Sequence, residues 1–133
     1  MNTLFLVIAA LVIVAGIAFF FWRKIQSRRY LSGAKAQQLL AAWARIPSIA
    51  DDHRKIIEAD KIVDQALYEL GYRGSFADKM KKAQARFPNK EQLWQAHKLR
   101  NRIAHEMNVQ LLPREVQSAL MAFEQALKKL CRP

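Results

Sequence analysis

The hydrophobic pattern divides the chain into one uninterrupted apolar stretch and a longer amphipathic part. Residues 3–22 are twenty positions without a charged side chain, enough at 1.5 Å per residue to cross roughly 30 Å of hydrocarbon. Beyond residue 33, apolar positions recur every three or four residues, which is typical of helices with one buried face. The pattern predicts an all-α protein, with a single N-terminal transmembrane helix followed by an antiparallel bundle of four or five helices.

Capping and breaking residues set the expected boundaries within the bundle. Gly71 gives a C-terminal cap signal, Ser75 and Asp78 resemble a capping box, and Pro113 suits a first helical position. The connections are short, so neighbouring helices are expected to run antiparallel. The predicted helices cover residues 34–46, 51–70, 76–87, 91–108 and 113–130.

The apolar stretch has the features of a retained anchor and lacks those of a cleaved signal peptide. No Lys or Arg precedes it, its apolar core is long, and it ends in bulky aromatic residues at 19–22. Arg23, Lys24, Arg28 and Arg29 follow it, so the positive-inside rule places the N-terminus outside and the C-terminal part in the cytoplasm, at the inner or cytoplasmic membrane. The same four cations could also attract anionic lipid headgroups at the membrane surface.

The expected organisation is therefore a transmembrane anchor at 1–22, a basic juxtamembrane linker at 23–33 and a helical bundle domain at 34–133. The net charge is +11, and without the four linker cations it is still +7 beyond Tyr30. This favours a polyanionic partner, either RNA or the membrane surface. A single cysteine, Cys131, excludes an internal disulfide framework and a cysteine metal site. No motif calls for a cofactor or a metal.

The segment AHKLRNRIAHE at 96–106 places unusual chemistry on the fourth predicted helix of the bundle. On a helical wheel, Arg100 falls near the middle of the apolar arc, while His97, Asn101 and His105 line one flank. The two histidines are eight residues apart, about 12 Å along the axis, so they cannot share one metal ion.

A buried arginine needs a carboxylate, and Asp60 and Asp64 are the best placed candidates on the second predicted helix. One interpretation is a structural ion pair between Asp60 and Arg100 that fixes helix register. The other is that Arg100, Asn101 and His105 form a phosphate-binding and proton-transfer group.

The stretch LRNRIAH at 99–105 fits the R-x-x-x-x-H motif, in its Arg-Asn form, of the HEPN superfamily of small helical bundles. The surroundings resemble it too, with IIEADKIVDQALYELGYRG at 56–74, then a basic helix, then LWQAHKLRNRIAHE at 93–106, then an amphipathic closing helix. The resemblance covers roughly residues 56–130 and leaves out the anchor and the first helix of the bundle.

The resemblance implies an up-and-down bundle that dimerises with its motif helices close together, forming a composite cleft. Many HEPN proteins are metal-independent endoribonucleases. Carried over to this chain, Arg100 would contact the scissile phosphate, Asn101 would help orient it, and His105 would act as general acid or base while the RNA 2′-hydroxyl attacks. His97 and Asp60 match no position of the motif, and with Asp64 they are expected to support it.

Other HEPN-like bundles are binding or dimerisation modules, and the membrane anchor favours that function here. The expected protein is a single-pass membrane-anchored cytoplasmic bundle that forms a homodimer or binds a protein partner not identified by the sequence. The alternative is a metal-independent endoribonuclease acting on RNA through Arg100, Asn101 and His105. A third reading is an accessory that binds lipid headgroups or nucleotides.

Overall fold

The protein is all-α, as the periodicity predicts. The computed structural model describes residues 2–27 and 30–132, and side chains at 2–22 and 30–132. Within these residues the only strand-like feature is one isolated bridge. The elements are α1 (Asn2–Ser27), α2 (Gly33–Ala44), η1 (Ile46–Ser48), α3 (Asp52–Glu69), α4 (Phe76–Ala83), η2 (Gln84–Arg86), α5 (Lys90–His105) and α6 (Pro113–Leu130).

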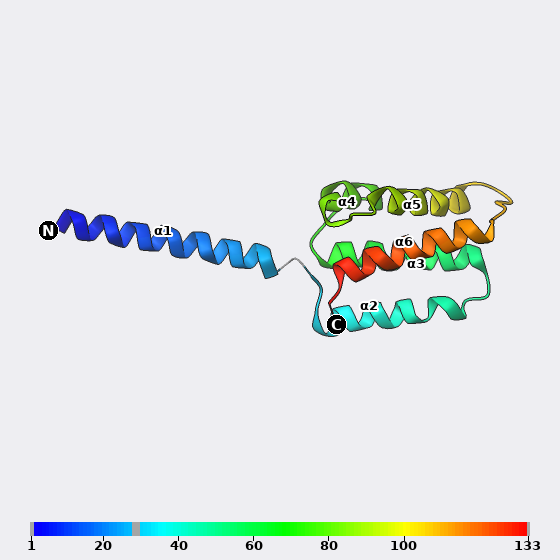
Figure 1. The fold of residues 1–133 in the computed structure, drawn as a ribbon, viewed down its shortest axis with the longest axis horizontal. Coiled ribbons are helices and arrows are strands. Elements are labelled where there is room, and N and C mark those ends of the chain that lie inside the picture. The colour runs from blue at the N-terminus through cyan, green and yellow to red at the C-terminus, as the bar shows by residue number, and fades with distance from the viewer. Residues whose placement is uncertain (1, 28–29, 133) are drawn as a thin grey trace.

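Helix α1 lies outside the bundle formed by the other helices (Figure 1). Its 21-residue segment Asn2–Trp22 is long and apolar enough to cross a membrane, and none of that segment is buried. A core helix of a soluble domain would be covered by the rest of the chain, so α1 is not part of the bundle core. The side chains of the four predicted membrane-surface cations Arg23, Lys24, Arg28 and Arg29 lie outside the described residues.

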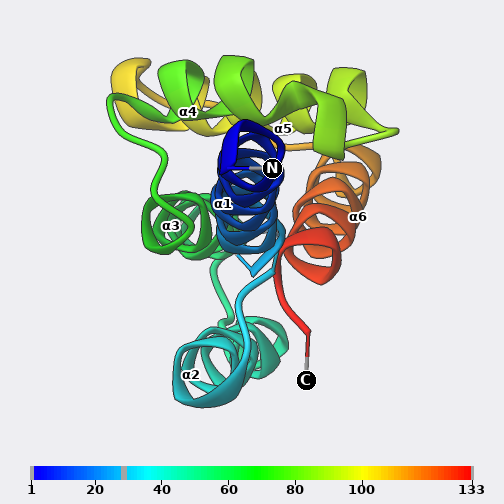
Figure 2. The ribbon, with the colours of Figure 1, turned by 90° about the vertical axis from the view of Figure 1, so that its left-hand side faces the viewer.

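The bundle has three layers, with α4 and α5 on one side, α3 and α6 in the middle and α2 on the other side (Figures 1 and 2). Each helix turns its apolar stripe toward α3 and α6, so burial of these stripes is the main force that assembles the layers. The largest fully buried side chains are Ile56, Val63, Leu67, Met80, Leu93, Phe123, Leu127 and Leu130.

Local signals in the sequence fix several helix ends. The capping box at α4 forms as predicted: the Ser75 hydroxyl accepts from the Asp78 amide, and the Asp78 carboxylate accepts from the Ser75 amide. Gly74 has φ +107°, and a Cβ there would lie 2.8 Å from the Asp78 side chain, so only glycine fits this turn. Gly71, with φ +98°, follows α3 as predicted and lets the amide of Tyr72 bond back to the carbonyl of Leu67.

Three predicted boundaries are wrong by a few residues. Helix α2 ends at Ala44 and is followed by the separate 3₁₀ turn η1, and α4 ends at Ala83 before η2. Helix α5 ends at His105 instead of residue 108, because Glu106 is extended and Asn108 has φ +57°. The sequence places Met107 on the buried arc of this helix, but it follows the helix end and is 90% exposed.

The residues that leave α1 are attached to the end of α6. The Leu31 amide donates to the Leu130 carbonyl at 2.7 Å, and the Arg132 amide donates to the Leu31 carbonyl at 2.7 Å. Leu31 and Cys131 are both buried in this bridge. The Arg132 guanidinium covers the ring of Tyr30, 4.0 Å from its centroid. The start and the end of the bundle are therefore joined at one point.

Burial raises the pKa of the Cys131 thiol above its ordinary value, so little reactive thiolate is present at neutral pH. We expect iodoacetamide to alkylate Cys131 slowly in the folded chain. Leu31→Ala loosens the bridge and should speed alkylation by about tenfold, whereas the exposed control Gln37→Ala should leave the rate unchanged. The measurement is mass spectrometry of the alkylated fraction over time. Equal rates in all three proteins would contradict this account of the bridge.

Candidate functional site

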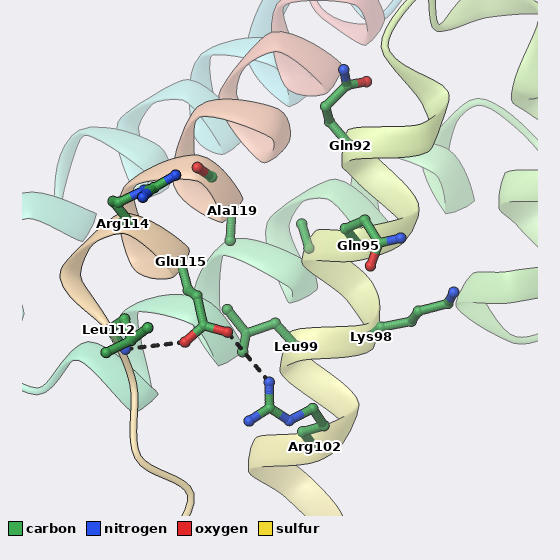
Figure 3. Close-up of a pocket in the computed structure, with 11 residues that line it drawn as sticks. Gln92, Gln95, Lys98, Leu99, Arg102, Leu112, Arg114, Glu115 and Ala119 are labelled. Atoms are coloured by element: carbon green, nitrogen blue, oxygen red, sulfur yellow. Dashed lines mark hydrogen bonds and ion pairs between the residues drawn. The ribbon is translucent and has the colours of Figure 1, made fainter.

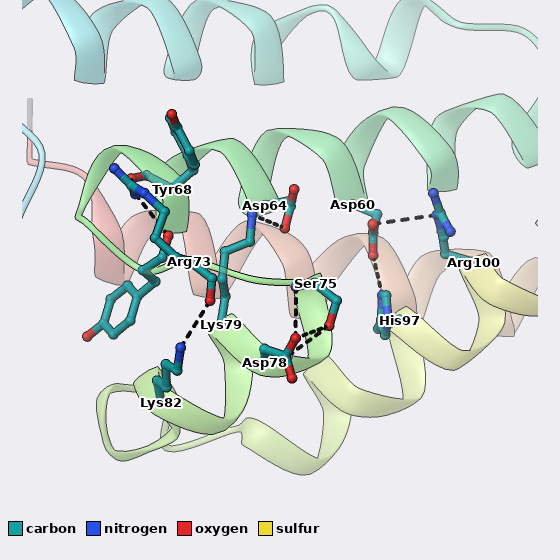
Figure 4. A network of polar contacts seen from close by, with 11 residues as sticks. Asp60, Asp64, Tyr68, Arg73, Ser75, Asp78, Lys79, Lys82, His97 and Arg100 are labelled. Carbon is teal, nitrogen blue, oxygen red and sulfur yellow. Dashed lines mark hydrogen bonds and ion pairs between the residues drawn. The ribbon is translucent and has the colours of Figure 1, made fainter.

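The polar group predicted on α5 is organised around a contact with α3. His97 Nδ1 lies 2.8 Å from Asp60 Oδ1, and the Asn101 amide nitrogen lies 3.2 Å from His97 Nε2. The Arg100 guanidinium donates to the Asn101 amide oxygen at 3.1 Å and approaches the second carboxylate oxygen of Asp60. We call these four residues the Asp60–His97 network; Figure 4 shows Asp60 between His97 and Arg100.

The inner half of this network is buried. Asp60 is 4% exposed and His97 is 8% exposed. The imidazole ring stacks on Phe76, the first residue of α4, with a centroid distance of 4.2 Å and an interplanar angle of 19°. The Trp94 ring lies edge-on to the imidazole, with a centroid distance of 6.2 Å and an interplanar angle of 67°. His97 therefore touches residues of three helices, and it holds α3, α4 and α5 together.

The partners of the imidazole define its hydrogen-bonding roles. An ionised carboxylate only accepts hydrogen bonds, so the Nδ1–H group of His97 donates a hydrogen bond to Asp60. The Asn101 oxygen is occupied by Arg100, so its NH₂ group faces His97 Nε2 and donates to it. In this arrangement every member orients the next, from the buried carboxylate outward to the guanidinium.

Arg100 lies at the outer edge of the network, and the prediction that it sits in the middle of the buried face is wrong. Its side chain is 30% exposed, and its Nε is 3.6 Å from Asp60 Oδ2. That distance makes an ion pair without a hydrogen bond, and the buried Nε has no hydrogen-bond partner among the described residues. The reason is that His97 occupies the inner position beside the carboxylate. The expected pairing of Arg100 with Asp60 is present, in this weaker form.

Asp64 is not part of the network, although it lies one turn from Asp60 on α3. Its Oδ1 is 2.8 Å from the Nζ atom of Lys79, whose side chain is 6% exposed. The pair is an electrostatic contact, because its geometry does not meet the requirements of a hydrogen bond. Lys79 comes from α4, so Asp64 holds α4 against α3, as Figure 4 shows.

His105 is separate from the other two motif residues. It is exposed at the last position of α5, and within the described part of the chain its side chain makes no hydrogen bond or ion pair. Five residues correspond to a rotation of about 140° around a helix axis, so Arg100 and His105 point in different directions. A single chain therefore brings Arg100 and Asn101 together and leaves His105 apart.

A concave surface lies on the other side of α5, against α6 (Figure 3). This groove has a volume of about 650 Å³ and its apolar floor includes Ala96, Leu99 and Ala119. The guanidinium of Arg102 donates to Glu115 across it at 3.4 Å. The groove contains none of the motif residues, so it is distinct from the Asp60–His97 network.

Sequence reasoning missed two of the side chains that build this region. Phe76 opens the predicted helix at 76–87, and nothing in its spacing marks it as the partner of His97. Lys79 follows Phe76 by three residues in a lysine-rich helix, and only its position on the inner side of α4 distinguishes it from the exposed Lys81 and Lys82. The α4 helical period, which puts residues 76, 79, 80 and 83 on one face, was the available signal.

Among the described residues, no group of three or more His, Cys, Asp and Glu side chains is placed to hold a metal ion. Comparison with protein-family models, curated proteins and solved structures finds no match to this chain.

Removing the Asp60 carboxylate should destabilise the bundle strongly, because it leaves buried His97 without its acceptor and Arg100 without its counter-charge. We expect Asp60→Ala to lower the free energy of unfolding by about 3–5 kcal/mol. The matched control is Glu58→Ala on the same helix, where the carboxylate is 37% exposed and pairs only with Lys61; its cost should stay below about 1 kcal/mol. Urea unfolding of the full chain in detergent measures both. Similar losses in the two variants would contradict the structural role of the network.

Proposed function

We propose that this protein is a single-pass membrane-anchored helical bundle of HEPN-like type that works as a binding and dimerisation module. The anchor is α1, with the bundle on the cytoplasmic side of the inner or cytoplasmic membrane. The apolar, uncovered segment Asn2–Trp22 supports the anchor. The cations that follow it in the sequence support the orientation, since cytoplasmic flanks carry the excess of Lys and Arg.

The observation that carries the binding role is a rigid, partly exposed polar edge on α5. Asp60 and His97 fix Arg100 and Asn101 from behind, so their outer atoms are held in place, while the Arg100 side chain remains 30% exposed. Groups ordered before binding lose less entropy when a partner arrives. The edge is thus suited to a partner that supplies acceptors.

Exposed apolar side chains follow α5 in the chain. Met107 is 90% exposed and Leu112 is 64% exposed in the connection between α5 and α6. Exposed apolar side chains and fixed polar groups are both typical of protein interfaces. A second copy of the chain fits best, because two α5 helices side by side would bring the His105 of one copy toward the Arg100 of the other. The resemblance to HEPN bundles implies the same arrangement.

A cross-linking experiment tests this dimer in the full chain. In a Cys131→Ala background, His105→Cys should form disulfide-linked dimers under mild oxidation in detergent micelles, because the two α5 ends would be close. Gln65→Cys, on the exposed face of α3, is the matched control and should cross-link only at the rate of random collision. The readout is non-reducing electrophoresis. Equal yields at both positions, or a monomeric mass at every concentration, would rule out this interface.

The alternative function is a metal-independent endoribonuclease. The observation that favours it is the partial exposure of Arg100, 30% for its side chain, together with the exposure of His105 on the same helix. In a dimer, Arg100 would bind the scissile phosphate and Asn101 would orient it. His105 would transfer the proton as the RNA 2′-hydroxyl attacks.

RNA cleavage by the full chain in detergent micelles tests this alternative directly. If the protein is a nuclease, single-stranded RNA is cut in the presence of EDTA, and His105→Ala slows cleavage by at least about a hundredfold, the usual contribution of a general acid or base. His53→Ala is the control, because that histidine binds the carbonyl of Val109 away from the motif. If the wild-type chain does not cleave RNA, or if His105→Ala cleaves it equally fast, the nuclease function is contradicted. The binding module is then the remaining proposal.

A further inference from the structure

The end of the bundle nearest α1 is built from parts that are distant in the sequence. It comprises the start of α2, the end of α3, α4, the start of α5 and the end of α6, and Figure 2 views it along α1. We call this surface the α1 end. The α5–α6 connection, which follows His105 and includes Met107, lies at the opposite end (Figure 1).

The tether between α1 and this surface is short. Helix α1 ends at Ser27, and Leu31 is already bonded to the end of α6. Four Cα–Cα steps span about 14 Å at full extension, and the five residues from Trp22 to Ser27 add about 7.5 Å of helix. With α1 in a membrane, as proposed above, the α1 end stays close to the lipid headgroups.

The positive charge of the bundle is concentrated at the same end. Residues 73–90, which include α4, hold six Lys and Arg and one acid, and residues 125–132 hold three Lys and Arg and no acid. These two segments carry a net charge of +8. The rest of the bundle, residues 30–72 and 91–124, holds nine cations and ten acids and carries a net charge of −1. The two segments therefore account for the whole excess of positive charge.

Much of this charge is exposed and available. Lys81, Lys90 and Lys129 are exposed and form no ion pair within the described part of the chain. The single acid of the two segments, Asp78, is bound in the capping box, where hydrogen bonds from Ser75 hold the pKa of its carboxyl below its ordinary value. Asp78 therefore stays as an internal cap of α4, and its single charge offsets only part of that of the nearby Lys81 and Lys82.

We propose that the α1 end is a docking surface for the anionic headgroups of the leaflet in which α1 is anchored. The exposed lysines of these two basic segments, held beside acidic lipid, are attracted to it, and the attraction weakens with salt. Docking seats the bundle on the membrane through α4 and the end of α6. It turns the opposite end, with the motif and the exposed apolar side chains, away from the lipid and toward the cytoplasm.

The full chain in lipid nanodiscs tests this orientation. In a Cys131→Ala background, a nitroxide is attached at Gln84→Cys on the α1 end or at Gln110→Cys on the opposite end, both exposed and uncharged positions. Nickel-chelating lipid relaxes nitroxides near the headgroups. In nanodiscs containing phosphatidylglycerol, relaxation at position 84 should exceed that in pure phosphatidylcholine by about threefold, and position 110 should show no difference. Equal relaxation at position 84 in the two lipids would overturn the proposal.

Two triple variants with the same change in net charge identify the surface. Lys81→Gln, Lys90→Gln and Lys129→Gln together should abolish the lipid dependence at position 84. Arg45→Gln, Arg54→Gln and Arg114→Gln together remove three exposed cations elsewhere and should preserve it. A loss of lipid dependence in both triple variants, or in neither, would show that attraction to this particular surface does not orient the bundle.

The same samples separate this proposal from the anchor on which it rests. If α1 is not inserted, the chain separates from the nanodiscs during gel filtration at high pH. That result would contradict both the proposed anchor and the proposed docking surface. If the chain stays with the nanodiscs but relaxation at position 84 does not depend on the lipid, the proposed anchor is supported and only the docking surface is contradicted.

Discussion

The contact between the Asp60 carboxylate and the His97 imidazole determines how the rest of the bundle is arranged. Both side chains are buried, and a buried carboxylate is expensive unless its oxygens are satisfied. Here one oxygen accepts from His97 and the other faces Arg100, so the position of α5 along α3 is restricted to the register that meets both requirements. The Phe76 ring against the imidazole extends that restriction to α4.

The same contact explains why the motif on α5 is ordered. Arg100 and Asn101 take their positions from His97 and Asp60, and their outer atoms reach solvent at the edge of the helix. The residues that stabilise the bundle thus include the edge for which a binding role is proposed. The basic α1 end lies beside α1, and the connection between α5 and α6 lies at the opposite end of the bundle (Figure 1).

The sequence predicts the helices well because their signals are local. The Ser75–Asp78 capping box, Pro113 and the glycine after α3 each act within a few residues, and all three are found in the structure. The early end of α5 was missed because nothing local to residues 106–108 breaks the apolar period, and only the backbone shows the extended Glu106.

Contacts between helices are harder to predict from periodicity. The wheel assigned Arg100 to the buried side and His97 to the flank, but the structure reverses their order beside Asp60 because Phe76 of α4 covers the imidazole. The concentration of charge at the α1 end depends on the meeting of residues 73–90 and 125–132, which no property of either segment reveals. Their positions follow only from the three-layer arrangement of the helices.

A double-mutant cycle between Asp60 and His97 tests the central contact most directly. The four proteins are the wild-type chain, Asp60→Asn, His97→Ala and the double variant, each unfolded by urea in detergent. If the contact holds α3 to α5 as described, the coupling free energy is favourable by at least about 1 kcal/mol, within the range for residues in one hydrogen-bonded network. A coupling free energy near zero, with the two single losses simply adding, would contradict the account.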